Sequence, residues 1–226
     1  MDWFDFRDPV SAWTHAAGCV LALPATVFLW FHSQGIRIKQ IGFTIFGLSM
    51  MCCYAGSTLY HGVRLTPKEI DFCEKIDHMG IYLLIAGTIT PLALVVLRGW
   101  WRLSNLIVAW TLAVVGITLN LVPLDIPDAV STGIYLGMGW GMVFCYFELV
   151  RALSHQALLG AVTGGMLYTV GAVINLVKWP NLWPGVFAAH ELFHVFVMAG
   201  SLAHFVFMVR VVAPYQTETS SASRAP

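Results

Sequence analysis

Seven apolar stretches, each about as long as a membrane span, dominate the sequence. Because an α-helix needs about 20 mostly apolar residues to cross a bilayer, each stretch can do so. Short polar connections separate the stretches, so consecutive helices are expected to run antiparallel. The sequence therefore predicts an all-α fold, an integral membrane bundle of seven transmembrane helices. The expected spans are residues 14–31, 40–61, 78–97, 103–122, 130–149, 157–177 and 187–209.

The composition supports a membrane protein and argues against other classes. Of the 226 residues, 58% are hydrophobic and 11% are charged, whereas soluble domains carry about 25% charged residues. Net charge is zero and there is no basic run, so nucleic acid is not an expected partner. We expect a transmembrane domain over residues 1–213, a disordered polar tail over 214–226, and a location in the plasma membrane (the cell inner membrane).

Residues 190–205 read HELFHVFVMAGSLAHF, which places two histidines at the start of an apolar stretch. His190 and His194 are four residues apart, so on an α-helix both imidazoles project from one face, about 6 Å apart along the axis. Two imidazoles at that spacing can share a zinc ion. Because ionisable groups are costly in hydrocarbon, the pair indicates either a functional site or two packed, hydrogen-bonded core histidines.

Topology places further polar residues at the same membrane depth. His61 closes the second apolar stretch, Asp77 opens the third, and His190 opens the seventh. In an antiparallel bundle these three points lie near one face of the membrane. Three histidines with an open fourth position are the ligand set of a catalytic zinc site. We therefore expect His61, His190 and His194 to bind Zn2+.

Two more side chains are candidates for the chemistry of such a site. Asp77 could orient a water molecule or accept its proton. Ser57 lies one helical turn before His61, where its hydroxyl could hydrogen-bond the water, a substrate carbonyl or a histidine. The alternative for Ser57 is a hydrogen bond to its own helix.

Two other histidines are not expected to bind the same ion. His15 lies on the same side of the membrane but has no partner at ligand spacing. His204 is about 21 Å beyond His190 along the helix and belongs to the other leaflet.

The start of the third helix can be placed from its capping residues. Thr66, Pro67 and Glu69 fit a capping box with proline at the first helical position. A straight helix from Pro67 would carry Asp77 about 15 Å inward from its start, too deep to meet His61. The two can meet only if residues 67–75 lie along the membrane interface or if the helix bends. We predict the interfacial segment, because residues 67–75 carry five charged side chains.

Several of these segments resemble the hemolysin III family, which belongs with the progestin and adipoQ receptors. The likeness lies in STLYH at 57–61, DHMGIYLLIAGTITP at 77–91 and the 190–205 stretch, and it extends to WTHAAG at 13–18 and GGMLYTVGAV at 164–173. The resemblance implies a seven-helix membrane fold with zinc held by His61, His190 and His194, and with Asp77 and Ser57 beside it. The wider superfamily includes alkaline ceramidases, which implies hydrolysis of a lipid amide.

Two features depart from the family pattern. The lead DPVSAWTH at 8–15 differs from the Glu- and Asn-containing lead expected before Thr14-His15. Asn175 stands where an aromatic residue is expected in the sixth helix.

These observations predict a zinc-dependent integral membrane hydrolase that acts on an amide or ester of a membrane lipid or lipid-like small molecule. One alternative is a non-enzymatic membrane protein, whether receptor, pore former or transporter, with a structural zinc. Another is an intramembrane metalloprotease, because residues 190–194 also match His-Glu-x-x-His with Glu191 as general base. The sequence leaves the oligomeric state open.

Overall fold

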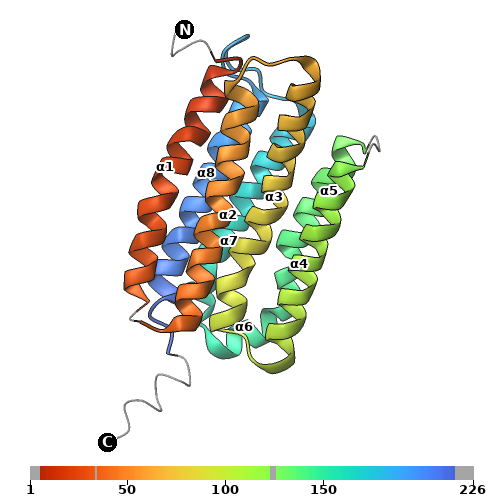
Figure 1. The fold of residues 1–226 in the computed structure, drawn as a ribbon. Coiled ribbons are helices and arrows are strands. Elements are labelled where there is room, and N and C mark those ends of the chain that lie inside the picture. The colour runs from red at the N-terminus through yellow and green to blue at the C-terminus, as the bar shows by residue number, and fades with distance from the viewer. Residues whose placement is uncertain (1–5, 34, 123–125, 217–226) are drawn as a thin grey trace, which may run out of the picture.

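The computed structural model describes residues 6–33, 35–122 and 126–216, and this part of the chain is helical with short connections (Figure 1). The α-helices are α1 (Pro9–His32), α2 (Arg37–Gly62), α3 (Pro67–Val95), α4 (Gly99–Leu121), α5 (Asp128–Trp140), α6 (Tyr146–Ala152), α7 (His155–Val177) and α8 (Ala189–Phe207). A 3-10 helix, Gly141–Cys145, joins α5 to α6, and a π-helical turn, Met208–Val212, continues α8.

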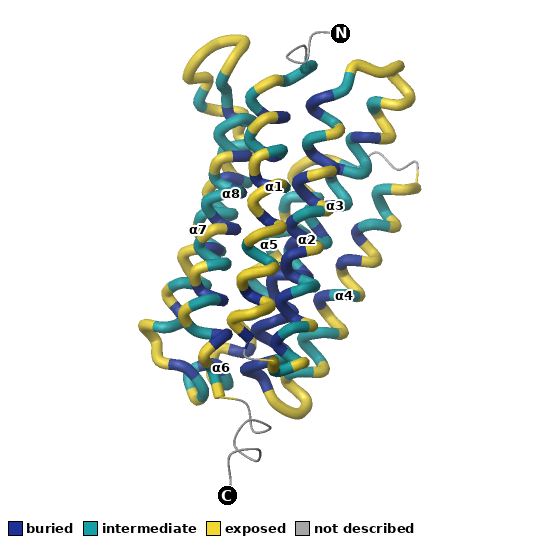
Figure 2. Tube along the Cα trace, turned by 60° about the vertical axis from the view of Figure 1, so that its left-hand side comes forward, coloured by how far each residue is buried: buried dark blue, intermediate teal, exposed yellow. Residues whose placement is uncertain are grey.

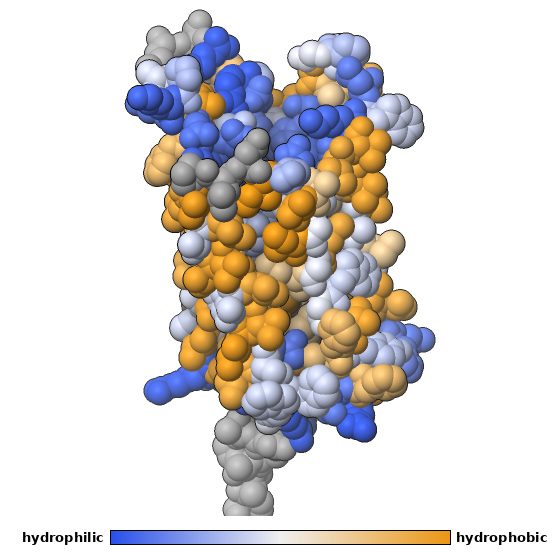
Figure 3. Space-filling model, turned by 90° about the vertical axis from the view of Figure 1, so that its right-hand side faces the viewer, coloured by the Kyte–Doolittle hydropathy of each residue, from blue (hydrophilic) through white to orange (hydrophobic). Residues whose placement is uncertain are grey.

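Seven segments of the described chain are long and apolar enough to cross a membrane, which confirms the predicted fold class. The fifth span, Asp128–Ala152, is composite, because the 3-10 helix interrupts it. The first and third helices begin earlier than their apolar stretches, at Pro9 and Pro67. Figure 3 shows the resulting surface, a band of apolar side chains between two polar ends. The predicted polar tail falls mostly outside the described residues.

Helices α2 and α3 form the buried centre of the bundle (Figure 2). Helix α2 packs mainly against α1 and α3, and α8 packs mainly against α7. Glycine lets α2 and α3 approach closely, because a Cβ atom on Gly80 would lie 2.7 Å from the Cα atom of Cys53. Helix α5 makes far fewer contacts with its neighbours. The bundle is therefore tight around α2 and α3 and loose around α5.

The third helix begins as its capping residues predict. Glu69 accepts hydrogen bonds from the backbone and the hydroxyl of Thr66, at 2.9 and 2.6 Å. The prediction that residues 67–75 lie separately along the interface is wrong, since they are the first turns of the one helix that carries Asp77. The amino-terminal ends of α1, α3 and α8 and the carboxyl end of α2 meet at the top of Figure 1.

Candidate metal centre

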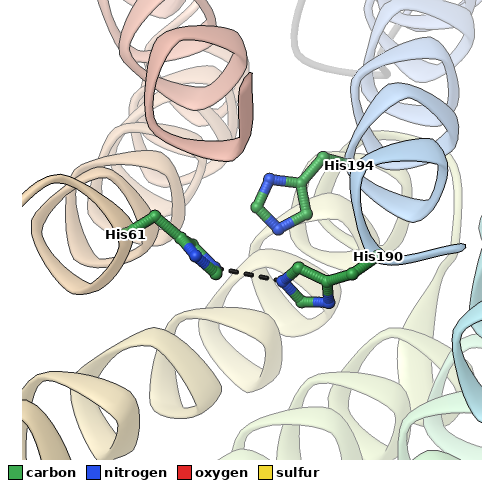
Figure 4. A group of neighbouring side chains, drawn as sticks. All are labelled: His61, His190 and His194. Atoms are coloured by element: carbon green, nitrogen blue, oxygen red, sulfur yellow. Dashed lines mark hydrogen bonds between the residues drawn. The ribbon is translucent and has the colours of Figure 1, made fainter. Parts of the chain in front are cut away.

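Three histidines converge at this end of the bundle (Figure 4). His61 comes from the last turn of α2, and His190 and His194 from the first turns of α8. One nitrogen of each ring lies within 4.8 Å of the others, and the Nε2 atoms of His61 and His190 are 3.1 Å apart. Two nitrogens bound to one tetrahedral zinc ion lie about 3.3 Å apart. The three rings therefore fit a shared zinc ion with only small movements.

In two of these rings, the nitrogen that points away from the cluster lies within hydrogen-bond distance of a side-chain oxygen. The Nδ1 atom of His61 lies 3.0 Å from Oδ2 of Asp8, and that of His190 lies 3.0 Å from Oδ1 of Asn175. Because both oxygens are acceptors, each pairs with a protonated Nδ1, and a neutral ring in that tautomer presents its Nε2 lone pair to the other ring. At 3.1 Å the two Nε2 atoms can share a proton in a hydrogen bond, as Figure 4 draws it, or a metal ion. Metal-binding histidines are oriented by this kind of outer hydrogen bond.

Unpaired polar atoms gather around the third ring. In the described residues, four buried side-chain polar atoms make no hydrogen bond, namely Nδ1 of His194, Oγ of Ser57 and both ring nitrogens of His15. His15 stacks on His194, with ring centroids 3.8 Å apart and an interplanar angle of 7°. Buried polar atoms are nearly always paired, so a cluster of exceptions indicates a site built for a polar species.

Asp77 reaches the histidines although it lies deeper along its own helix. Its Oδ2 atom is 3.8 Å from Nε2 of His61. Every Cα–Cβ bond in an α-helix leans toward the helix amino terminus. Helix α3 begins beyond the end of α2, because Gly56 of α2 lies level with Ile76 of α3, where an added Cβ atom would be 3.2 Å from the Ile76 carbonyl oxygen. Since the two helices are antiparallel, His61 leans inward and Asp77 leans outward, which shortens the remaining separation.

Ser57 lies beside the same carboxylate. Its hydroxyl faces Asp77 but makes no hydrogen bond of standard geometry. The alternative of a hydrogen bond to its own helix is therefore not what the structure contains. The side chain is fully buried and lines the same cavity as Asp77, so its hydroxyl can serve a polar group bound there.

Asp8 and Asn175 are the site residues that sequence reasoning missed. Asp8 is attached twice to the end of α2, because its backbone N–H also donates to the His61 carbonyl at 2.9 Å. The Nε atom of Arg7 donates to Oδ2 of Asp8 at 3.0 Å, and its guanidinium lies 4.2 Å from the Tyr60 ring centroid. Although partial burial raises the pKa of Asp8, its hydrogen bonds with His61 and Arg7 hold that pKa below the ordinary value.

Glu191 does not face the histidine cluster with a free carboxylate. Its Oε2 atom accepts from the backbone N–H of Ala188 at 2.8 Å, and Oε1 accepts from the Ser11 hydroxyl at 3.2 Å. One oxygen thus caps the start of α8, and the other connects α8 to α1. The sequence does match His-Glu-x-x-His, but both oxygens of this glutamate are engaged in hydrogen bonds with Ala188 and Ser11 rather than facing the histidines.

A cavity of about 760 Å³ extends from the cluster into the bundle. Ser57, Asp77, His190 and His194 line one end, and its walls come mainly from α3, α5, α7 and α8. Apolar side chains such as Leu84, Val197 and Phe207 form much of its lining. Charged residues including Asp71, Glu74 and Asp128 lie at the outer mouth. The cavity therefore combines a polar end with a long apolar interior.

In the described chain, seven helices long and apolar enough to span a membrane, with a largely buried triple-histidine cluster near one end, define a multi-pass integral membrane protein with a candidate metal centre. The sequence profile described as Haemolysin-III related matches residues 5–205. The chain is 37% identical over 205 residues to the Hemolysin-3 homolog of Bacillus subtilis (strain 168), covering 89% of this chain and 93% of that protein. It is 34% identical over 216 residues to Hemolysin-3 of Bacillus cereus, covering 95% of each.

The chain belongs to the hemolysin III family. A more distant relative is the Adiponectin receptor protein of Drosophila melanogaster, 25% identical over 217 residues that cover 85% of this chain and 48% of that protein. This likeness supports the predicted grouping with the progestin and adipoQ receptors.

Proposed function

We propose that this protein is a zinc-dependent membrane hydrolase that cleaves an amide or ester bond of a lipid-like molecule. The observation that carries the proposal is the pair of facing Nε2 atoms on His61 and His190, 3.1 Å apart, with both outer nitrogens already hydrogen-bonded to oxygen. A carboxylate 3.8 Å from this pair and an adjoining apolar cavity are the further parts that such a hydrolase needs.

The residues of the site have separable roles in this proposal. A zinc ion held by His61, His190 and His194 would supply Lewis-acid activation of water and of the substrate carbonyl. Asp77 accepts a proton from the attacking water as the new carbon–oxygen bond forms. Asp77 then returns that proton to the leaving nitrogen or oxygen as the old bond breaks, so that one water is consumed for each bond cleaved.

The cavity supports a lipid-like substrate rather than a peptide. Its interior beyond the histidines is lined by apolar side chains of α3, α5, α7 and α8. A hydrocarbon chain leaves no polar group unpaired in such a lining, whereas a peptide would leave its backbone amides unpaired. The engagement of both Glu191 oxygens with Ser11 and Ala188 gives the alternative of a metalloprotease no comparable support.

One observation favours a second candidate, a non-enzymatic membrane protein with a structural zinc. His61 lies on α2, which packs mainly against α1 and α3, whereas the other two histidines lie on α8, which packs mainly against α7. A metal ion at this site would therefore join two groups of helices that otherwise share little contact. In that case zinc removal would unfold the bundle and no hydrolysis would be found.

Metal content and hydrolysis, measured on the same preparations, test the proposal. Wild-type protein is expected to hold near-stoichiometric zinc by elemental analysis and to release fatty acid from lipid amides or esters. His190→Ala is expected to lose both zinc and activity, whereas His32→Ala, at an exposed position at the end of α1, keeps both. Zinc-loaded wild-type protein that hydrolyses neither lipid amides nor lipid esters would overturn the hydrolase and leave the structural zinc.

A further inference from the structure

The deep end of the cavity contains one polar side chain that the proposed hydrolysis does not use. His204 lies on α8 and lines the cavity together with Phe207 and Met208. At 1.5 Å per residue it is about 15 Å from His194 along the helix axis, in the opposite half of the bundle from the histidine cluster. It is therefore too far away to bind the same metal ion.

The imidazole of His204 is held in place but is not hydrogen-bonded. It stacks on Tyr168, with ring centroids 5.4 Å apart and an interplanar angle of 27°. It also lies directly over Gly164, where an added Cβ atom would be 2.5 Å from its Nε2 atom. Among the described residues its side chain has no hydrogen-bond partner, and the ring is only partly buried. The ring is therefore held in place by packing, and its nitrogens are free to pair with a molecule in the cavity.

The neighbouring polar groups are, by contrast, already paired. The hydroxyl of Tyr54 donates to Oγ of Ser201 at 2.6 Å, and the hydroxyl of Tyr168 lies 2.8 Å from the same oxygen. Thr88, which also lines the cavity, donates to the carbonyl of Leu84 at 2.7 Å. Among the described residues, the tyrosines pair with Ser201 and Thr88 pairs with its own helix, whereas His204 has both ring nitrogens available to a ligand.

We propose that His204 forms a second polar subsite, which binds a hydroxyl group on the hydrocarbon chain of the bound lipid. A neutral imidazole offers one donor and one acceptor, and a hydroxyl group can pair with either. A plain hydrocarbon chain leaves both unpaired, and a charged group would be costly so far inside the bundle. The side chains beside His204 in the cavity, such as Tyr168, Phe207 and Met208, carry no charge.

The inference deepens the proposed function, because it rests on a lipid chain that lies in the cavity with its reactive linkage at the histidine cluster. It predicts that the preferred ligands are lipids whose hydrocarbon chain carries a hydroxyl group. It requires binding in this orientation but not turnover, so the two proposals can fail separately.

Ricinoleic acid and oleic acid form a suitable pair of probes, since they differ by one hydroxyl group on the twelfth carbon. Their Kd values are measured on purified full-length protein by competition with radiolabelled oleic acid. Wild-type protein is expected to bind ricinoleic acid about tenfold more tightly, the effect of one added hydrogen bond in a dry site. Equal Kd values for the two acids in wild-type protein would overturn the inference.

Three variants separate the subsite from a general effect on folding. His204→Phe keeps a flat ring and is expected to bind both acids with the wild-type Kd for oleic acid. His204→Gln retains a donor and an acceptor and is expected to keep a preference for ricinoleic acid. Gly164→Ala leaves His204 in the chain but displaces its ring, so the preference should fall. A full preference in folded His204→Phe would contradict the assignment.

Two controls complete the test. His32→Phe, at an exposed position outside the cavity, is expected to leave both Kd values unchanged. A preference for ricinoleic acid in protein that hydrolyses no lipid would overturn only the proposed enzymatic function. Hydrolysis of lipid amides by a protein that binds the two acids equally would overturn only the hydroxyl subsite.

Discussion

The two ends of the bundle differ in the pairing of their fully buried polar atoms. Near the amino-terminal ends of α1 and α8, His15, Ser57 and His194 carry buried atoms without hydrogen bonds. Toward the middle and the far end, Ser201 pairs with two tyrosines, and Lys39 donates to the carbonyl of Ala213 at 2.6 Å. Paired groups of this kind stabilise the fold, whereas unpaired ones lower stability and persist where a ligand satisfies them.

The largest effect should come from removing a histidine of the cluster. His194→Ala is expected to abolish near-stoichiometric zinc binding, because two imidazoles are left where a stable site uses at least three protein ligands. Elemental analysis of purified variant and wild-type protein measures the change. Undiminished zinc in a folded variant would show that the unpaired polar atoms at this end of the bundle do not mark a zinc site.

Asp77→Asn should separate chemistry from metal binding. The amide is nearly the same size but cannot accept a proton, so kcat is expected to fall about 10²–10⁴-fold. Zinc content should stay near the wild-type level, since Asp77 is not one of the three proposed ligands. A variant that loses its zinc along with its activity would reassign Asp77 to holding the metal.

Asp8→Asn tests the outer hydrogen bond to His61. Loss of the carboxylate is expected to weaken zinc binding about 10–100-fold, the usual effect of removing an outer partner of a metal-binding histidine. Competition with a chelator of known affinity measures it. Asp71→Asn is the matched control at the same end, because Asp71 is exposed and pairs with Lys75 at 3.2 Å, so its loss should leave zinc affinity unchanged.

Ser201→Ala should have the smallest effect, and it should lower stability without changing zinc content. It leaves the hydroxyls of Tyr54 and Tyr168 without their shared partner, so the free energy of unfolding is expected to fall by about 1–2 kcal/mol. Thermal unfolding measures the loss, and zinc content should not change. Equal losses of zinc in Ser201→Ala and Asp8→Asn would remove the contrast between the two ends.

Topology alone was enough to predict that His61, His190, His194 and Asp77 lie together. The order of apolar stretches fixes which helix ends share a membrane face, and the structure has these four side chains at one end. Their role in binding zinc stays a prediction. The capping box at Thr66 and Glu69 was also readable, because it depends on neighbours in sequence.

Other features depend on distances that no local pattern records. Asp8 lies before the first helix and Asn175 near the end of α7, so neither belongs to a periodic motif that points to a histidine. The sequence shows that Asn175 replaces an aromatic residue of the family pattern, but only the structure shows why it matters, through its 3.0 Å contact with His190. The expected interfacial segment was wrong because α3 begins beyond the end of α2 and because the two side chains lean toward each other, and neither feature is visible in the sequence.

The double attachment of Asp8 to the last turn of α2 has a practical consequence for handling the protein. A bulky group fused just ahead of Phe6 is expected to disturb Asp8, which hydrogen-bonds both the carbonyl and the ring of His61. An affinity tag is therefore better placed at the carboxyl terminus, because the π-helical turn Met208–Val212 that follows α8 lies at the opposite end of the bundle in Figure 1. The same attachment makes a fluorophore near Arg7 a useful reporter for the proposed zinc binding, since its signal should change on zinc addition if His61 is a ligand.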